Sequence, residues 1–200
     1  MKELEIEFKN LLTGEEYGRL HEALFKDTQP VVQTNFYIDT PDFSLKHNRL
    51  LLRIRDMGGQ QVMTLKEPTV KGVMEYHGEV ESDLNFDHNI RKDEIPELIC
   101  GELERFAIDT TQLKIYGALS TERRETSYKD GLLVLDKNSY LDTEDFELEF
   151  EVDNYDKGET HFLNLLEEYG IERRREVTKV ARFYNKLNDI RSGDNYANSI

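Results

Sequence analysis

The sequence is poor in the residues that build covalent or thiolate-bound scaffolds. Its 200 residues include one cysteine (Cys100), four prolines and no tryptophan. A single cysteine excludes an intramolecular disulfide and any zinc site built from several thiolates. No apolar run approaches the roughly 18 residues of a membrane-spanning helix, and the opening residues lack the apolar stretch of a signal peptide. We therefore expect a cytoplasmic protein that binds no membrane.

Basic residues are also few. The chain has 26 Lys and Arg residues against 41 Asp and Glu residues, a formal net charge of −15. Binding to duplex nucleic acid depends on a basic surface that releases counterions, so this composition argues against such a partner. The count still allows a concentrated basic pocket inside an acidic shell.

Period-two alternation of apolar and polar residues dominates the chain and predicts strands. Gly58-Gly59 and Lys129-Asp130-Gly131 are typical of hairpin turns between such strands. The predicted strands are residues 3–9, 33–39, 49–56, 61–67, 73–82, 113–126, 131–137 and 145–153. Mostly sequential strands with few long crossovers indicate an α+β fold dominated by a large antiparallel sheet or barrel.

Helical spacing interrupts the strands at four places. Thr13 and Glu16 fit a capping box that opens a helix through about Phe25. Apolar residues at helical spacing predict the other helices at 94–107, 158–169 and 177–188. The length predicts one domain, residues 1–188, followed by a polar and flexible C-terminal tail, residues 189–200.

Charged residues share one face of several predicted strands, and their sign differs from strand to strand. Glutamates dominate the first, fifth and eighth strands, whereas Arg53, Arg55 and Lys66 dominate the third and fourth. A solvated sheet face is the usual explanation for one such strand. Segregation by sign suggests instead a closed sheet whose lumen has an acidic wall and a basic wall. Carboxylates suit Mg²⁺ or Mn²⁺, and Arg and Lys suit phosphate, so a metal with a polyphosphate would satisfy both walls.

Glu5-Ile6-Glu7-Phe8-Lys9 resembles the E-x-E-x-K signature of the CYTH, or triphosphate tunnel metalloenzyme, superfamily. Further matches follow in the family's order, although Thr121 stands where many members have Lys. They are the Y-x-D-T strand at 37–40, R-x-R at 53–55, a lysine at Lys66, an acidic strand at 79–81, Arg123, late acidic strands at Asp136 and 147–149, and K-x-x-R at 179–182. Among its members the chain is most similar to bacterial CYTH-domain proteins often labelled adenylate cyclases.

The resemblance implies an eight-stranded antiparallel closed barrel, a tunnel with a charged lumen and helices packed outside. The side chains implied to hold a triphosphate are Lys9, Arg53, Arg55, Lys66, Arg123, Lys179 and Arg182. Those implied to hold Mg²⁺ or Mn²⁺ are Glu5, Glu7, Asp136, Glu147 and Glu149, with Glu151 on the same face as a further candidate.

Some roles in the lumen are less defined. Tyr37 and Lys66 occupy the places of a pair that influences metal preference and catalysis in some members, so they join Glu5 and Glu7 as catalytic candidates. The resemblance leaves open whether Glu79 and Glu81 would hold metal or orient the arginines. We expect His77, in the same strand, on the surface or beside the site rather than in the lumen.

The function implied is metal-dependent hydrolysis of a triphosphate-containing small molecule: inorganic triphosphate, or an organic one such as a nucleoside or thiamine triphosphate. Two alternatives stay open. One is an adenylate cyclase that converts ATP to cyclic AMP, and the other is a non-catalytic module that binds polyphosphate or phosphorylated ends. The sequence leaves open the substrate, the preferred metal, the number of ions, and whether the protein is a monomer or a homodimer.

Overall fold

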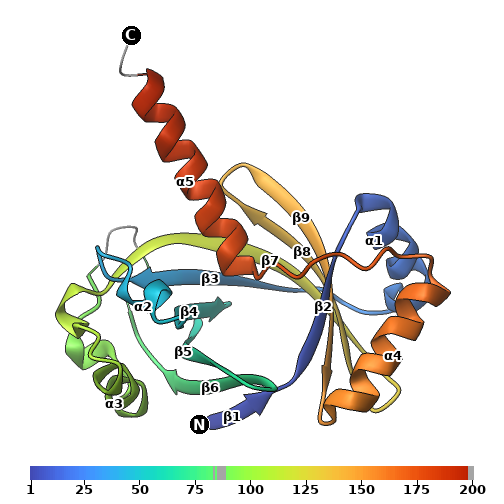
Figure 1. Ribbon diagram of the computed structural model, residues 1–200, viewed down its shortest axis with the longest axis horizontal. Helices are drawn as coiled ribbons and strands as arrows, with labels where there is room; N and C mark the ends of the chain where they lie inside the picture. Colours follow the sequence, from blue (N-terminus) through green and yellow to red (C-terminus); the bar gives the residue numbers. More distant parts are fainter. Residues whose placement is uncertain (83, 85–88, 198–200) are drawn as a thin grey trace.

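Nine strands form one antiparallel sheet in the computed structural model, which describes residues 1–82, 84 and 89–197 (Figure 1). The strands are β1 (Lys2–Glu5), β2 (Glu7–Leu12), β3 (Val31–Asp39), β4 (Leu51–Met57), β5 (Gln60–Thr69), β6 (Gly72–Glu79), β7 (Lys114–Tyr128), β8 (Gly131–Tyr140) and β9 (Thr143–Val152). Their order in the sheet is β1-β6-β5-β4-β3-β7-β8-β9-β2. This confirms the predicted α+β class with a large antiparallel sheet.

The first predicted strand is divided in two. β1 pairs with β6 at one edge of the sheet, and β2 pairs with β9 at the other edge. Only Ile6 separates them, and its carbonyl oxygen accepts a hydrogen bond from the Val152 amide at 2.9 Å. The sheet therefore curls until one chain segment reaches both of its edges. Its hydrogen bonding does not close a ring, so the eight-stranded closed barrel expected from the resemblance is not found in that form.

The other predicted strands and both predicted hairpins are confirmed. Gly58 and Gly59 connect β4 to β5 with φ angles of 65° and 94°, which glycine adopts without steric cost. Lys129 lies between β7 and β8 with a φ angle of 54°. These turns fix the register that places every second residue on the inner face of the curled sheet.

Helices cover the outer face on two sides (Figure 1). The helices are α1 (Gly14–Leu20), the π-helix η1 (His21–Phe25), α2 (Ser44–His47), α3 (Glu97–Arg105), α4 (Tyr155–Glu168) and α5 (Lys179–Ala197), with 3₁₀ turns η2 (Lys92–Glu94) and η3 (Thr110–Gln112). The capping box is present: Thr13 Oγ1 accepts from the Glu16 amide, and Glu16 accepts from the Thr13 amide at 2.7 Å. One core packs Ile99 and Leu103 of α3 against β4–β6, and another packs α1, η1 and α4 against β2, β8 and β9.

The last helix packs on the inner face instead, which corrects the expectation that all helices lie outside. Phe183 of α5 lies 5.1 Å, between ring centroids, from Tyr37 of β3. Gly117 of β7 makes room for this ring, since a Cβ at that position would overlap Phe183. α5 therefore covers part of the inner face, and its first turn lies next to the charged side chains.

The C-terminal segment 189–200 is helical as far as Ala197, as a continuation of α5. Its flexibility stays a prediction, as does the single-domain division at residue 188. No helix among the described residues combines the length and the apolar character that a membrane crossing requires.

We expect Gly117→Ala to destabilise the protein by about 1–3 kcal/mol, because the added methyl group forces Phe183 away from the sheet. For a chain of this size the melting temperature should fall by about 2–4 °C per kcal/mol. Gly101→Ala is the matched control, since nothing lies within 4 Å of its added Cβ in α3. Equal melting temperatures for the two variants would contradict the packing of α5 against β7.

Candidate functional site

The curled sheet and the first turn of α5 enclose a cavity of about 570 Å³. Eleven of the candidate site residues from the sequence line it: Glu5, Glu7, Lys9, Tyr37, Arg53, Arg55, Lys66, Arg123, Glu149, Glu151 and Lys179. Three others, Asp136, Glu147 and Arg182, lie in the wall without lining the cavity. The alternation of the strands thus brings charged residues from distant parts of the chain to one interior surface.

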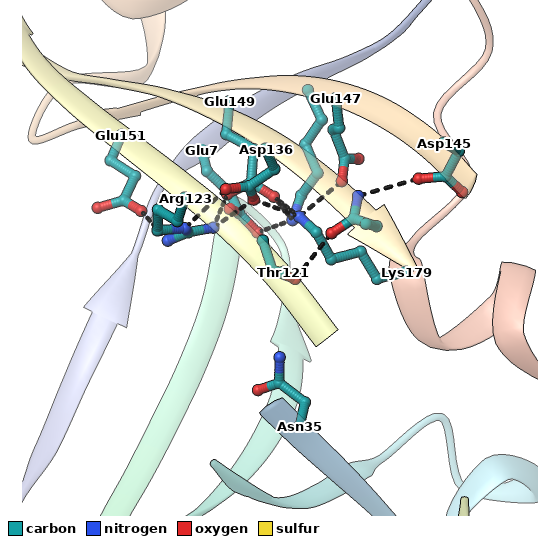
Figure 2. A network of polar contacts seen from close by, with 12 residues as sticks. Glu7, Asn35, Thr121, Arg123, Asp136, Asp145, Glu147, Glu149, Glu151 and Lys179 are labelled. Carbon is teal, nitrogen blue, oxygen red and sulfur yellow. Dashed lines mark hydrogen bonds and ion pairs between the residues drawn. The ribbon is translucent and has the colours of Figure 1, made fainter. Parts of the chain in front are cut away.

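The acidic wall is neutralised by cations of the protein itself (Figure 2). Lys179 Nζ lies 2.9 Å from a carboxylate oxygen of Asp136 and 2.6 Å from one of Glu147, and it also pairs with Glu149. Arg123 donates to both oxygens of Asp136 at 2.9 and 2.7 Å and to Glu149 at 2.7 Å. Although burial opposes it, these cations hold the pKa of Glu149 well below its usual range. The Glu149 carboxylate is therefore ionised, and the ion pairs with Lys179 and Arg123 fix the acidic side chains in position.

Arg182 acts from behind this wall. Its guanidinium donates to Asp145 at 2.8 and 3.2 Å and lies 3.2 Å from a Glu147 oxygen. Arg182 does not line the cavity, so it is not placed to contact a ligand there directly. Its geometry instead orients Glu147 toward Lys179.

A second group of carboxylates lies where β1, β2 and β9 meet. Ligand oxygens of Glu5, Glu7 and Glu151 come within 4.8 Å of one another. Burial raises the pKa of the Glu5 carboxyl to about 8; Lys66 opposes the shift and the neighbouring Glu7 adds to it. Lys9 pairs with Glu7 and lies 3.7 Å from Glu149. Three carboxylates at this spacing form an all-oxygen set of the kind that hard divalent cations bind.

The opposite wall carries positive charge without acidic partners. Arg53 Nε is buried and has no hydrogen-bond partner. Arg55 Nε donates to the neutral amide oxygen of Asn35 at 3.1 Å. Burial, with Arg53 and Arg123 nearby, lowers the pKa of Arg55 to about 9. Within the described part of the chain neither guanidinium of β4 has a carboxylate at ion-pair distance. Both groups are therefore available to bind an anionic ligand.

Lys66 and Tyr37 occupy different surroundings. Lys66 Nζ lies 2.7 Å from Glu5 and also pairs with Glu75. Tyr37 is 2% exposed and packs against Phe183, and its strand partner on β4 is Arg53. The described residues show no contact between Tyr37 and Lys66, so a joint role for them stays a prediction.

On β6 the residues that line the cavity are not the ones that the sequence analysis proposed. Glu75 and His77 line the cavity, whereas Glu79 ends the strand and Glu81 follows it, both outside the lining. The interpretation of His77 as a residue outside the lumen is wrong. The signal was available: Glu75 is two residues before His77 and four before Glu79, on one face of the same strand. Asn35, which fixes Arg55, was also missed, because a buried amide has no distinctive sequence pattern.

The sequence of this chain is similar to a known protein family and to a protein of Bacillus subtilis. The model of the CYTH domain family matches residues 3–184. A protein of Bacillus subtilis (strain 168) named "Putative triphosphatase YjbK" is 37% identical over 187 residues, which cover 92% of this chain and 96% of that protein.

Two solved structures are similar over most of their length. A Bacillus halodurans protein described as a "putative adenylate cyclase" superposes with a TM-score of 0.80 at 32% identity, covering 92% of this chain and 98% of that one. The Hippeastrum protein "Putative adenylyl cyclase HpAC1", described as having a dominant triphosphatase activity, has a TM-score of 0.73 at 23% identity, covering 91% and 96%. At that identity the second structure supports the fold alone.

The pKa of Glu5 generates a pH-dependent prediction. Between pH of about 4.5 and about 8 the folded protein keeps the Glu5 proton that the unfolded chain loses, so the wild type loses stability as the pH rises through this window. Glu5→Gln lacks this proton exchange. In metal-free buffer its melting temperature should rise relative to wild type from pH 4.5 to pH 8 and stay level above.

Glu15→Gln, which removes an exposed carboxylate of α1, is the matched control for thermal melts over this range. The same pH-dependent gain in both variants would contradict the burial of Glu5 among like charges.

Proposed function

The chain belongs to the CYTH domain family, and on that premise we propose that it is a divalent-metal-dependent hydrolase of inorganic triphosphate or a small organic triphosphate. The relative named as a triphosphatase, 37% identical over nearly the whole chain, supports hydrolysis. The observation that carries the proposal is the pair of half-buried guanidinium groups of Arg53 and Arg55, which have no carboxylate partner among the described residues and lie across one cavity from a carboxylate cluster.

The basic wall matches a polyanion because its charge has no internal partner. A buried guanidinium without a partner is costly, and a phosphate oxygen would satisfy it with charge-assisted hydrogen bonds. Arg53, Arg55 and Lys66 would hold the phosphate chain from β4 and β5. Lys9, Arg123 and Lys179 would reach it from the acidic wall, where Arg182 keeps Glu147 in place.

The carboxylates fit a hard divalent cation. Glu5, Glu7 and Glu151 offer only oxygen atoms, which is the donor set that Mg²⁺ and Mn²⁺ prefer. Asp136, Glu147 and Glu149 stay predicted ligands, and each of them would first have to exchange a bond to Lys179. When bound, the ion would neutralise phosphate oxygens and withdraw electron density from the reacting phosphorus.

The residues of the chain would then act by positioning. The arginines align the phosphate chain, and the curled sheet shields it from bulk water. The oxygen of one water molecule forms a bond to the terminal phosphorus, the bond from that phosphorus to the bridging oxygen breaks, and a carboxylate that lines the cavity accepts the proton of the water. We further propose that the cavity is a tunnel, because β1 and β2 join the two edges of the sheet through Ile6. A cytoplasmic location and a monomeric or homodimeric state stay predictions from the sequence.

Cyclisation of ATP requires a surface for adenine beside the phosphates. The aromatic residues that line the cavity, Tyr37 and Tyr184, are 2% and 5% exposed and pack against Phe183. Neither offers a free ring face among the described residues. This favours hydrolysis over the cyclase activity in the name of the Bacillus halodurans relative.

The deciding experiment measures phosphate release from inorganic triphosphate, ATP and thiamine triphosphate, each with Mg²⁺ and with Mn²⁺, while chromatography follows cyclic AMP. Release from at least one substrate, without cyclic AMP, is expected. Cyclic AMP from ATP would replace the proposal with the cyclase. Thermal stabilisation by one of these ligands without phosphate release would favour the non-catalytic module that binds polyphosphate or phosphorylated ends over the hydrolase.

Arg53→Met separates binding from folding. Because the buried Nε of Arg53 has no hydrogen-bond partner, this change should leave the ligand-free melting temperature unchanged or raise it by about 2–4 °C per kcal/mol gained. The wild type should gain about 2.7 kcal/mol of stability from inorganic triphosphate at a hundredfold excess over Kd. We expect the variant to lose most of that gain, and its kcat/KM to fall about 100-fold or more.

Arg19→Met is the control, because it removes an exposed arginine of α1. A lower ligand-free melting temperature for Arg53→Met, with the triphosphate-induced gain intact, would show that Arg53 serves folding rather than the ligand.

A further inference from the structure

A histidine and two glutamates meet at the β1–β6 side of the cavity. Ligand atoms of Glu3, Glu75 and His77 lie within 4.8 Å of one another. This group shares no residue with Glu5, Glu7 and Glu151, although Glu75 is hydrogen-bonded to Glu5, and it differs in kind because it offers an imidazole nitrogen. The proposed reaction gives it no role.

The register of the sheet builds this group. Glu3 of β1 and Glu75 of β6 are direct partners across the ladder, and His77 follows two residues later on the same face. Thr64 of β5 is the direct partner of His77 on the other side. Three residues fixed by neighbouring strands hold their geometry better than residues on loops would.

The two ring nitrogens of His77 have different partners. Nδ1 lies 3.0 Å from Thr64 Oγ1. Nε2 lies 3.0 Å from Glu3 Oε1 and 3.2 Å from Glu75 Oε2. When Nδ1–H donates to the threonine hydroxyl, the lone pair of Nε2 faces two carboxylates. Such a hydrogen bond on the second nitrogen is the usual device that orients a metal-binding histidine.

The two carboxylate oxygens of Glu75 face different neighbours. Oε1 pairs with Lys66, whereas Oε2 faces His77. A metal ion between Oε2, Nε2 and Glu3 would therefore leave the Lys66 pair intact. Glu3 has a side chain that is 52% exposed, so an ion can enter from the cavity mouth and keep an open coordination position there.

We propose that Glu3, Glu75 and His77 form a second cation site, selective for borderline transition ions such as Zn²⁺ or Co²⁺ over Mg²⁺. Imidazole with carboxylates is a common ligand set for Zn²⁺, whereas Mg²⁺ prefers oxygen donors alone. Arg53, Thr64 and His77 are successive neighbours across β4, β5 and β6. An ion here would consequently lie on the wall that carries the uncompensated arginines, beside any bound polyphosphate.

The test uses the full chain with Mg²⁺ in excess to fill the all-oxygen set, and Co²⁺ as the probe, followed by its visible absorption. Wild type should bind Co²⁺ with the spectrum of an imidazole-ligated ion. His77→Gln and Glu3→Gln should each weaken binding by at least about tenfold. His161→Gln is the matched control, since that histidine pairs with a single carboxylate, Asp130, at 3.1 Å.

Equal Co²⁺ affinity in wild type and His77→Gln, or complete displacement of Co²⁺ by Mg²⁺, would overturn the proposal. Should the variants fail to fold, imidazole ¹⁵N resonances of the wild type decide. Zn²⁺ should shift the Nε2 resonance of the histidine whose Nδ1 is protonated by its bond to Thr64, and no shift of any imidazole would refute the site. Phosphate release plays no part in this readout, so its outcome is independent of the triphosphatase proposal.

Discussion

The structure depends on the curling of its sheet. The sheet curls so far that one chain segment, β1 and β2, reaches both of its edges, and one face of every strand therefore points to the interior. In this protein that interior face carries the charges, and the apolar face meets α1, α3 and α4. Charges inside a protein cost free energy unless they are paired. Much of the arrangement of the site follows from which of these charges find a partner within the chain and which do not.

α5 supplies the compensation on one side. It begins at Lys179, which pairs with three buried carboxylates, and Phe183 one turn later fixes the helix on β3 and β7. Removal of one member of such a buried network costs about 3–5 kcal/mol, because it strands the others. The acidic wall is therefore structurally self-sufficient. The β4 wall has no equivalent element, and Arg53 and Arg55 stay uncompensated within the described residues.

Sequence patterns predicted the strands and the faces of their side chains, which local spacing determines. They missed the features that depend on contacts between distant segments of the chain. Period-two alternation located the strands and assigned Arg53, Arg55 and Lys66 to one face, because a strand's own geometry fixes that face. The division of residues 3–9 at Ile6 was not predictable, since it depends on β6 and β9 lying at opposite edges of the sheet. The inward packing of α5 depends likewise on Gly117, whose role is visible only beside Phe183. On β6, the alternation placed Glu75, His77 and Glu79 on one face, and the pairing of Glu75 with Lys66 and Glu3 shows which part of that face lines the cavity.

The difference between the two walls implies an order of events for any triphosphate that enters. Arg53 and Arg55 have no carboxylate to leave, so phosphate oxygens gain their hydrogen bonds without breaking existing ion pairs. Lys179 and Arg123 are already bound to Asp136 and Glu149, and they must exchange those bonds before they reach a phosphate. Were Asp136 and Glu149 to hold a divalent cation, as we propose, Lys179 and Arg123 would be released from them and could turn to the phosphate. We therefore expect the β4 wall to select the anion and the acidic wall to respond to the anion and metal together.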